Sequence, residues 1–129
     1  MNDPVVSRQL RVLVVEDEPG LCELACIWVE ALGFEAVGVE APEEALKALA
    51  AGRFDVLFTD VMMPGPVDGV ALAQEARRRQ PGLRVVLTSG DLQGVLDRPD
   101  LPGEVLVKPY TRKDLAQAIE RTGFGRLGP

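Results

Sequence analysis

Five short runs of mostly β-branched apolar residues recur along the chain, and this rhythm constrains the fold more than any other feature of the sequence. The runs lie at 12–15, 34–39, 56–58, 85–87 and 105–107. Most of them are continuous rather than alternating, which is typical of strands that are covered on both faces in a parallel sheet. Only the second run, Phe34 to Val39, has the mixed character of a half-exposed strand.

Helical segments with recognisable start and stop signals separate these runs. They are predicted at 19–32, 42–51, 68–80, 92–96 and 111–121. Asp68 and Thr111 are the predicted N-caps of the third and fifth helices, and Gly52 is predicted to cap the second helix in a left-handed conformation. Glycines and prolines between 91 and 103 limit the fourth helix to a turn or two.

The alternation of strand and helix predicts a single α/β domain. Its architecture is a doubly wound, five-stranded parallel sheet with right-handed crossovers, sandwiched between helices in three layers, with a shortened fourth helix. The length of 129 residues leaves no room for a second module. No internal repeat or linker interrupts the pattern.

Charge and residue usage exclude several classes of function. A formal net charge of -6 disfavours nucleic acid as a partner, and no apolar run is long enough to span a bilayer. Because the N-terminus lacks the pattern of a secretion signal, we expect a cytoplasmic protein. The absence of histidine excludes Ser-His and Cys-His nucleophile systems and most catalytic zinc sites. Cys22 and Cys26, one helical turn apart, are interpreted as small buried hydrophobes.

Polar residues that follow four of the five strands give the first indication of chemistry. In doubly wound sheets the ligand site lies at the carboxyl ends of the strands. The residues placed there are Glu16, Asp17, Asp60, Thr88, Ser89 and Lys108. Three neighbouring carboxylates repel one another, and an all-oxygen site without His or Cys favours Mg²⁺ or Mn²⁺. With the divalent ion and Lys108 the charges sum to zero, and Asp60 becomes a candidate nucleophile for a phosphoryl group.

Four segments in the right order and spacing resemble one known family. They are VLVVEDEPG at 12–20, DVLFTDVMMPGPVDG at 55–69, VVLTSG at 85–90 and VLVKPY at 105–110. Together they resemble the receiver domain of two-component response regulators. The resemblance covers about residues 10–121, which leaves 1–9 and 122–129 as tails. It implies a flavodoxin-like fold with the strand order 2-1-3-4-5.

The resemblance also implies a role for each site residue. Asp60 matches the phospho-accepting aspartate, and Asp17 matches the direct Mg²⁺ ligand. Glu16 matches the second acid, which acts on the metal through water, and the backbone carbonyl of Met62 would be the third protein ligand. Lys108 would bind a phosphoryl oxygen.

The switch elements of the family are matched less uniformly. Because MPGPVDG is one residue longer than the common form, Ser89 followed by glycine matches the switch hydroxyl, with Thr88 as the alternative. Pro109 occupies the position of the family's cis proline. Val105 stands where an aromatic ring usually turns inward, so we expect the output surface to rely on residues 90–104 and the last helix.

The function implied is phospho-acceptance in signalling. A sensor histidine kinase or a histidine phosphotransfer protein would donate the group, a downstream protein target would respond, and the domain would catalyse only its own phosphorylation and dephosphorylation. The chain fits either a stand-alone regulator or a fragment of a longer protein such as a hybrid kinase, and its composition is compatible with a bacterial source. Two alternatives stay open: an interaction module that has lost the chemistry, and a Mg²⁺-dependent phosphatase of small phosphoesters.

Overall fold

The five apolar runs form the five strands of one sheet in a computed structural model, which describes residues 9–123. The elements, in chain order, are β1 (Arg11–Val15), α1 (Pro19–Ala31), β2 (Glu35–Val39), α2 (Pro42–Ala51), β3 (Val56–Asp60), α3 (Gly69–Arg79), β4 (Arg84–Ser89), α4 (Leu92–Leu96), β5 (Glu104–Val107) and α5 (Arg112–Arg121). The predicted tails lie outside the described residues except for Gln9, Thr122 and Gly123.

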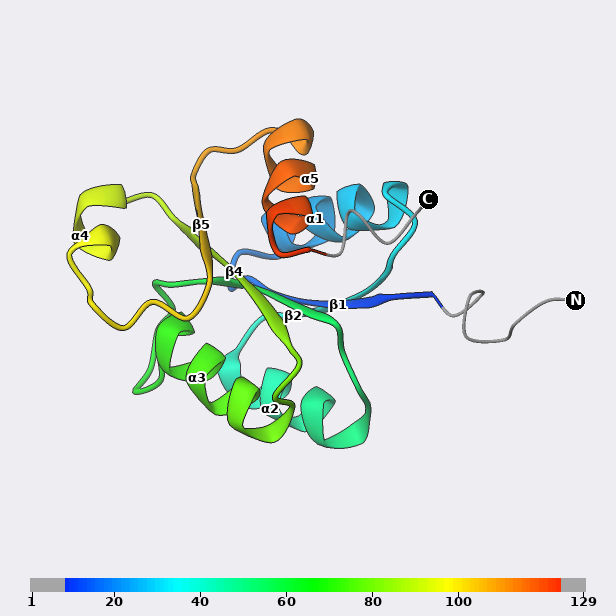
Figure 1. Ribbon diagram of the computed structural model, residues 1–129, viewed down its shortest axis with the longest axis horizontal. Helices are drawn as coiled ribbons and strands as arrows, with labels where there is room; N and C mark the ends of the chain where they lie inside the picture. The colour runs from blue at the N-terminus through cyan, green and yellow to red at the C-terminus, as the bar shows by residue number, and fades with distance from the viewer. Residues whose placement is uncertain (1–8, 124–129) are drawn as a thin grey trace, which may run out of the picture.

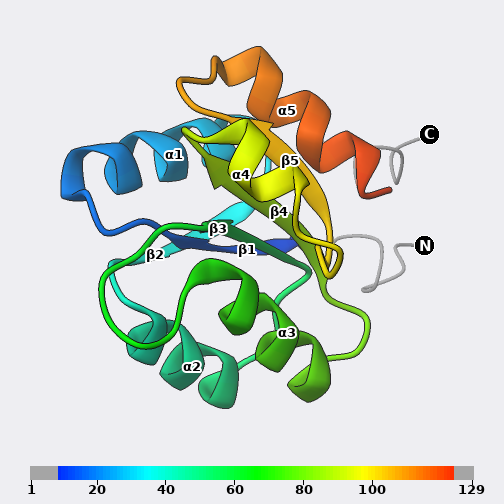
Figure 2. The same ribbon diagram turned by 90° about the vertical axis from the view of Figure 1, so that its left-hand side faces the viewer.

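All five strands are parallel and lie in the order β2-β1-β3-β4-β5 (Figure 1), which confirms the predicted topology. Helices α1 and α5 cover one face of the sheet, and α2 and α3 cover the other (Figure 2). The order changes direction beside β1, so the carboxyl ends of β1 and β3 meet at the switch point where such sheets bind ligands.

Burial along the strands follows their position in the sheet. Every residue of the central strand β3 is buried, whereas the edge strand β2 is only half-buried, as its mixed sequence predicted. One apolar cluster, which includes Leu13, Leu57 and Leu87, packs against α2 and α3. A second cluster, which includes Val14 and Phe58, packs against α1 and α5. The two clusters hold the strand ends in fixed register.

Two of the three predicted helix caps are confirmed. The Asp68 side chain accepts a hydrogen bond from the backbone N–H of Ala71 at 2.9 Å, and Thr111 forms a capping box with Asp114. The left-handed cap predicted at Gly52 is wrong, because its φ of -169° is extended backbone. The Gln80 side chain donates hydrogen bonds to the carbonyls of Leu49 and Gly52 and so satisfies the end of α2 without a left-handed turn.

The fourth helix is the short one that the sequence predicted. It spans five residues, and the chain then crosses to β5 without further regular structure. No helix in the described part of the chain is both long enough and apolar enough to cross a membrane.

Gly69, the first residue of α3, sits against the end of β3. Its N–H donates to the carbonyl of Val61 at 2.8 Å, so the 61–68 loop closes back onto the strand. A Cβ atom at position 69 would lie 1.9 Å from the carbonyl oxygen of Asp60. Only glycine permits this approach, which fixes the loop that borders Asp60.

We expect Gly69→Ala to lower the free energy of unfolding by about 1–3 kcal/mol, because the methyl group meets backbone that cannot yield. Gly82→Ala is the matched control, since a Cβ there has no heavy atom within 4 Å. Urea unfolding of both variants measures the effect. Equal stabilities for the two would show that the 61–68 loop moves freely.

Candidate functional site

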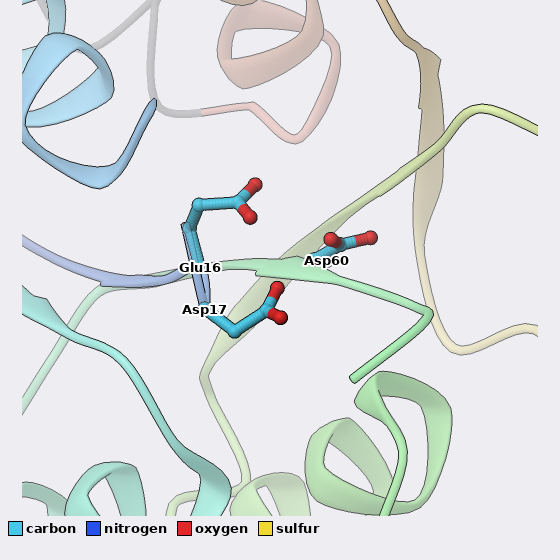
Figure 3. A group of neighbouring side chains, drawn as sticks. All are labelled: Glu16, Asp17 and Asp60. Carbon is cyan, nitrogen blue, oxygen red and sulfur yellow. The ribbon is translucent and has the colours of Figure 1, made fainter. Parts of the chain in front are cut away.

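Three carboxylates gather at the carboxyl ends of β1 and β3. Glu16 and Asp17 follow the last residue of β1, and Asp60 is the last residue of β3. One carboxylate oxygen from each lies within 4.8 Å of the others. Figure 3 shows the side chains projecting from the two neighbouring strands toward a common space. The parallel pairing of β1 with β3 therefore builds the cluster that the sequence predicted.

Lys108 joins two of these carboxylates. Its Nζ atom donates to Glu16 Oε1 and to Asp60 Oδ2, each at 2.8 Å. The side chains of Glu16 and Asp60 are 7% and 8% exposed, and that of Lys108 is 21% exposed. The two ion pairs are thus largely withdrawn from water. Charge interactions at such buried positions are stronger than at the surface.

For Glu16, the hydrogen bond from Lys108 does not fully offset the effect of burial on the pKa. Burial raises the pKa of Glu16, and the negative charge of Asp60 adds to this, while hydrogen bonds from Lys108 and from the N–H of Glu18 act in the opposite direction. Burial alone would lower the pKa of Lys108, but its hydrogen bonds to Asp60 and Glu16 outweigh burial and raise the pKa. Lys108 is therefore held as an ammonium group.

The donor set fits a divalent cation. Three ionised carboxylates and one ammonium group leave a charge of about -2, which a divalent ion neutralises. All the donors are oxygens from carboxylates, and one edge of the cluster is open because Asp17 is exposed. Mg²⁺ characteristically combines one or two carboxylates with retained water and a phosphate oxygen.

Backbone groups of the loop after β3 complete the surroundings of Asp60. The N–H of Met62 donates to Asp60 Oδ1 at 3.2 Å, which orients the carboxylate. The Met62 side chain points outward, with 69% of the residue exposed. The loop therefore brings Met62 next to Asp60, and its carbonyl as a metal ligand stays a prediction.

The two candidate hydroxyls have different environments. Ser89 is buried, and its Oγ accepts from the N–H of Asp91 at 3.0 Å and contacts the Asp91 carbonyl at 3.3 Å. Thr88 pairs with Asp60 across β3 and β4, and its hydroxyl is the one buried side-chain polar atom of residues 9–123 that lacks a partner. The Ser89 hydroxyl, which is tied to the loop that leads into α4, stays the predicted switch, with Thr88 as its alternative.

The loop after β5, which follows Lys108, contains a cis peptide bond and the aromatic ring of Tyr110. The Lys108–Pro109 peptide bond is cis, at the position that the resemblance indicated. The Tyr110 ring lies edge-on to both Phe58 and Trp28. A pocket of about 450 Å³ opens beside Lys108 between β5 and α1, and its apolar lining includes Leu21 and Leu24.

Sequence reasoning missed one ion pair near the site. Arg98, in the segment after α4, donates to Asp68 Oδ2 at 3.0 Å and lies 3.7 Å from Asp100 Oδ1. The Arg98 and Asp100 side chains are partly exposed, and Asp68 also caps α3. A separation of 30 residues between Arg98 and Asp68 leaves no local pattern that could reveal this contact.

The chain is similar to a sensor protein and to a response regulator protein. The sensor protein GacS of Pseudomonas syringae pv. syringae is 33% identical over an alignment that covers 100% of this chain and 15% of GacS. The response regulator protein FleR of Pseudomonas aeruginosa is 34% identical over 91% of this chain and 25% of FleR. The chain thus spans a small part of these two relatives.

A solved structure agrees with the fold. The response regulator protein TrrA of Thermotoga maritima, in complex with Mg²⁺-BeF, matches with a TM-score of 0.79 and 29% identity. The match covers 88% of this chain and 99% of that one. The family model of the response regulator receiver domain matches residues 12–120. The chain therefore belongs to the response regulator receiver domain family.

Proposed function

We propose that this receiver accepts a phosphoryl group on Asp60 in a Mg²⁺-dependent reaction and signals through the change that follows. The observation that carries the proposal is the position of Lys108 Nζ, 2.8 Å from both Asp60 and Glu16 beside the exposed Asp17. Phosphoryl transfer to a carboxylate requires positive charge beside the nucleophile and acids that can hold a metal ion. Lys108 and the pair Glu16 and Asp17 provide these groups at the same edge of the sheet as Asp60.

The residues divide the work of transfer. An Asp60 oxygen attacks phosphorus as the bond from phosphorus to a nitrogen of the donor's phosphoimidazole, protonated on its other nitrogen, breaks, which leaves an acyl phosphate on Asp60 and a neutral imidazole on the donor. The hydrogen bond from the Met62 N–H orients the Asp60 carboxylate. Lys108 already contacts Asp60 and would hold an oxygen of the transferred group. Asp17 and Asp60, with Glu16 acting through water and the Met62 carbonyl as a further ligand, would hold Mg²⁺, which would supply positive charge against the phosphoryl oxygens.

The partner that donates the group is proposed to be a sensor histidine kinase or a histidine phosphotransfer protein. These 129 residues contain no histidine, so the donor side chain must lie outside them. The apolar pocket between α1 and β5 opens beside Lys108, and Leu21 and Leu24 are exposed on its rim. Exposed leucines next to a charged site fit a protein surface better than a small hydrophilic donor.

Signalling is proposed to pass through residues 90–104. Phosphorylation replaces one negative charge by roughly two, which can draw the Ser89 hydroxyl away from Asp91. That movement would displace α4 and the segment behind it, and the Arg98–Asp68 ion pair ties this segment to the loop bordering Asp60. Val105 provides no ring to rotate, so this connection takes its place.

The function also implies no turnover of an outside substrate. We propose a signalling phosphoacceptor that catalyses only its own phosphorylation and dephosphorylation. Loss of the phosphoryl group by hydrolysis of the acyl phosphate would end the signal.

Incubation with acetyl phosphate and Mg²⁺ should add a single phosphoryl group, seen by intact-mass analysis. Asp60→Asn should abolish the adduct, because the amide is not a nucleophile for this step. Omission of Mg²⁺ should also abolish it. A folded wild-type protein that gains no mass would favour the alternative of an interaction module without the chemistry, and steady turnover of a small phosphoester by the wild type, lost in Asp60→Asn, would favour a phosphatase.

Asp17→Asn should weaken Mg²⁺ binding about tenfold or more, because it removes one of the charges that the cation neutralises. Glu43→Gln is the matched control, since this carboxylate is exposed in the first turn of α2, away from the cluster. Isothermal titration calorimetry measures both affinities. An unchanged affinity in Asp17→Asn would remove Asp17 from the metal site.

Arg98→Ala should release residues 90–104 before phosphorylation. Backbone amide shifts of this segment in the unphosphorylated variant are expected to move toward those of the phosphorylated wild type, and the further change on phosphorylation should shrink. Arg112→Ala, at the exposed start of α5, is the control. Phosphorylation shifts confined to positions far from residues 88–115 would contradict this output route.

A further inference from the structure

Cys22 and Cys26 form a second site, which the phosphoacceptor chemistry does not use. The sequence suggested two small buried hydrophobes, but only Cys22 is buried, while Cys26 is half-buried. Both thiols line a surface pocket of about 490 Å³ between the start of α1 and the edge strand β2. The interpretation as two core side chains is therefore incomplete.

Gly38 makes room for the two thiols. A Cβ atom at position 38 would lie 2.8 Å from the Sγ of Cys26 and 3.0 Å from the Sγ of Cys22. Both sulfurs thus reach within 3.0 Å of one point above the edge strand. Positions four apart on a helix face the same direction, and here the helix aims both thiols at the gap that the missing side chain leaves.

The rest of the pocket is acidic and contains no basic group. Its other lining residues are Pro19, Gly20, Glu23, Gly38 and Glu40. Glu23 and Glu40 are exposed, and within residues 9–123 neither carboxylate has a hydrogen-bond or ion-pair partner. Among the described residues only the carboxylate cluster brings three ligand atoms within 4.8 Å of one another, so Glu23 and Glu40 must turn toward the sulfurs to share an ion. The acidic lining of the pocket favours a cation.

We propose that Cys22 and Cys26 bind a thiophilic divalent cation of the Zn²⁺ type, with the Glu40 and Glu23 carboxylates completing the coordination. Two thiolates and two carboxylates form an acceptable tetrahedral set for such an ion. Each thiol gives up its proton to the solvent on binding, and the two thiolates alone balance the +2 charge of the ion.

The geometry of Cys22 and Cys26 fits metal binding better than the formation of a disulfide bond. Side chains four apart on a helix have Cβ atoms about 5–6 Å apart, whereas a disulfide needs about 3.5–4.5 Å. A disulfide would therefore distort the first turns of α1. Burial also raises the pKa of Cys22 to about 12, helped by the nearby Cys26 and Glu40, which leaves little thiolate to react with oxidants. A metal ion, in contrast, displaces the protons directly.

This site is separate from the Mg²⁺ site in ligand chemistry. The carboxylates of Glu16, Asp17 and Asp60 offer only oxygen and suit hard cations, while the thiol pair suits soft ones. One backbone group connects the two sites. The carbonyl of Val39 accepts the N–H of Glu16 at 3.1 Å and contacts the Sγ of Cys22 at 3.6 Å.

Titration of the full chain with Cd²⁺, after reduction and removal of bound metal, tests the proposal. Excess Mg²⁺ is kept present to occupy the carboxylate cluster. Ultraviolet charge-transfer absorbance from thiolate to cadmium should rise to a plateau at one Cd²⁺ per chain, and Zn²⁺ should displace it.

Variants distinguish the thiol site from other ways of holding the ion. Cys26→Ser, at the more exposed position, should remove the absorbance while circular dichroism shows the fold intact. Glu40→Gln should weaken binding about tenfold, whereas Glu120→Gln on α5 should leave it unchanged. Absence of the band in the wild type, a band that persists in Cys26→Ser, or a band seen only in a parallel titration without Mg²⁺ would each overturn the proposal.

Discussion

The site depends on a shared ion-pair partner for two nearly buried carboxylates that lie beside each other. Glu16 and Asp60 would repel strongly without a shared cation, and Lys108 supplies the one that the chain contributes. The lysine follows β5, two strands away from Asp60, so it must reach across the end of β4. Its backbone N–H donates to the carbonyl of Ser89 at 2.8 Å, which anchors the lysine over that strand end. The strand order β3-β4-β5 therefore brings the lysine charge to the two carboxylates.

Two loops border the site, one after β3 and one after β4, and different kinds of contact hold them. The loop after β3 is drawn back by Gly69 against the carbonyl of Asp60, so the loop has little freedom. The loop after β4, in contrast, is held by the Ser89 hydroxyl and by the Arg98–Asp68 pair, both of which are polar contacts that a change in charge can alter. One side of the site is fixed by sterics, and the other is adjustable.

Much of the fold and of the site could be predicted because the signals were local or followed from topology. Continuous apolar runs indicated buried parallel strands, and residues directly after such strands had to meet at one edge, which placed Glu16, Asp17, Asp60 and Lys108 together. Features that depend on distant side chains could not be predicted. Gly52 is extended because Gln80, from the end of α3, takes over the capping of α2. The room for the half-buried Cys26 thiol depends on the missing side chain at Gly38, on another element.

The edge-on contact between Trp28 and Tyr110 gives the molecule an intrinsic fluorescent probe. Trp28 is the only tryptophan of the sequence, its ring centroid lies 6.0 Å from that of Tyr110, and Tyr110 is two positions beyond the lysine that contacts Asp60. A shift of Lys108 would reach this aromatic pair through Pro109. Because indole emission depends on its immediate polar and aromatic surroundings, we expect the intrinsic fluorescence of the unlabelled protein to respond to the charge state of the strand ends.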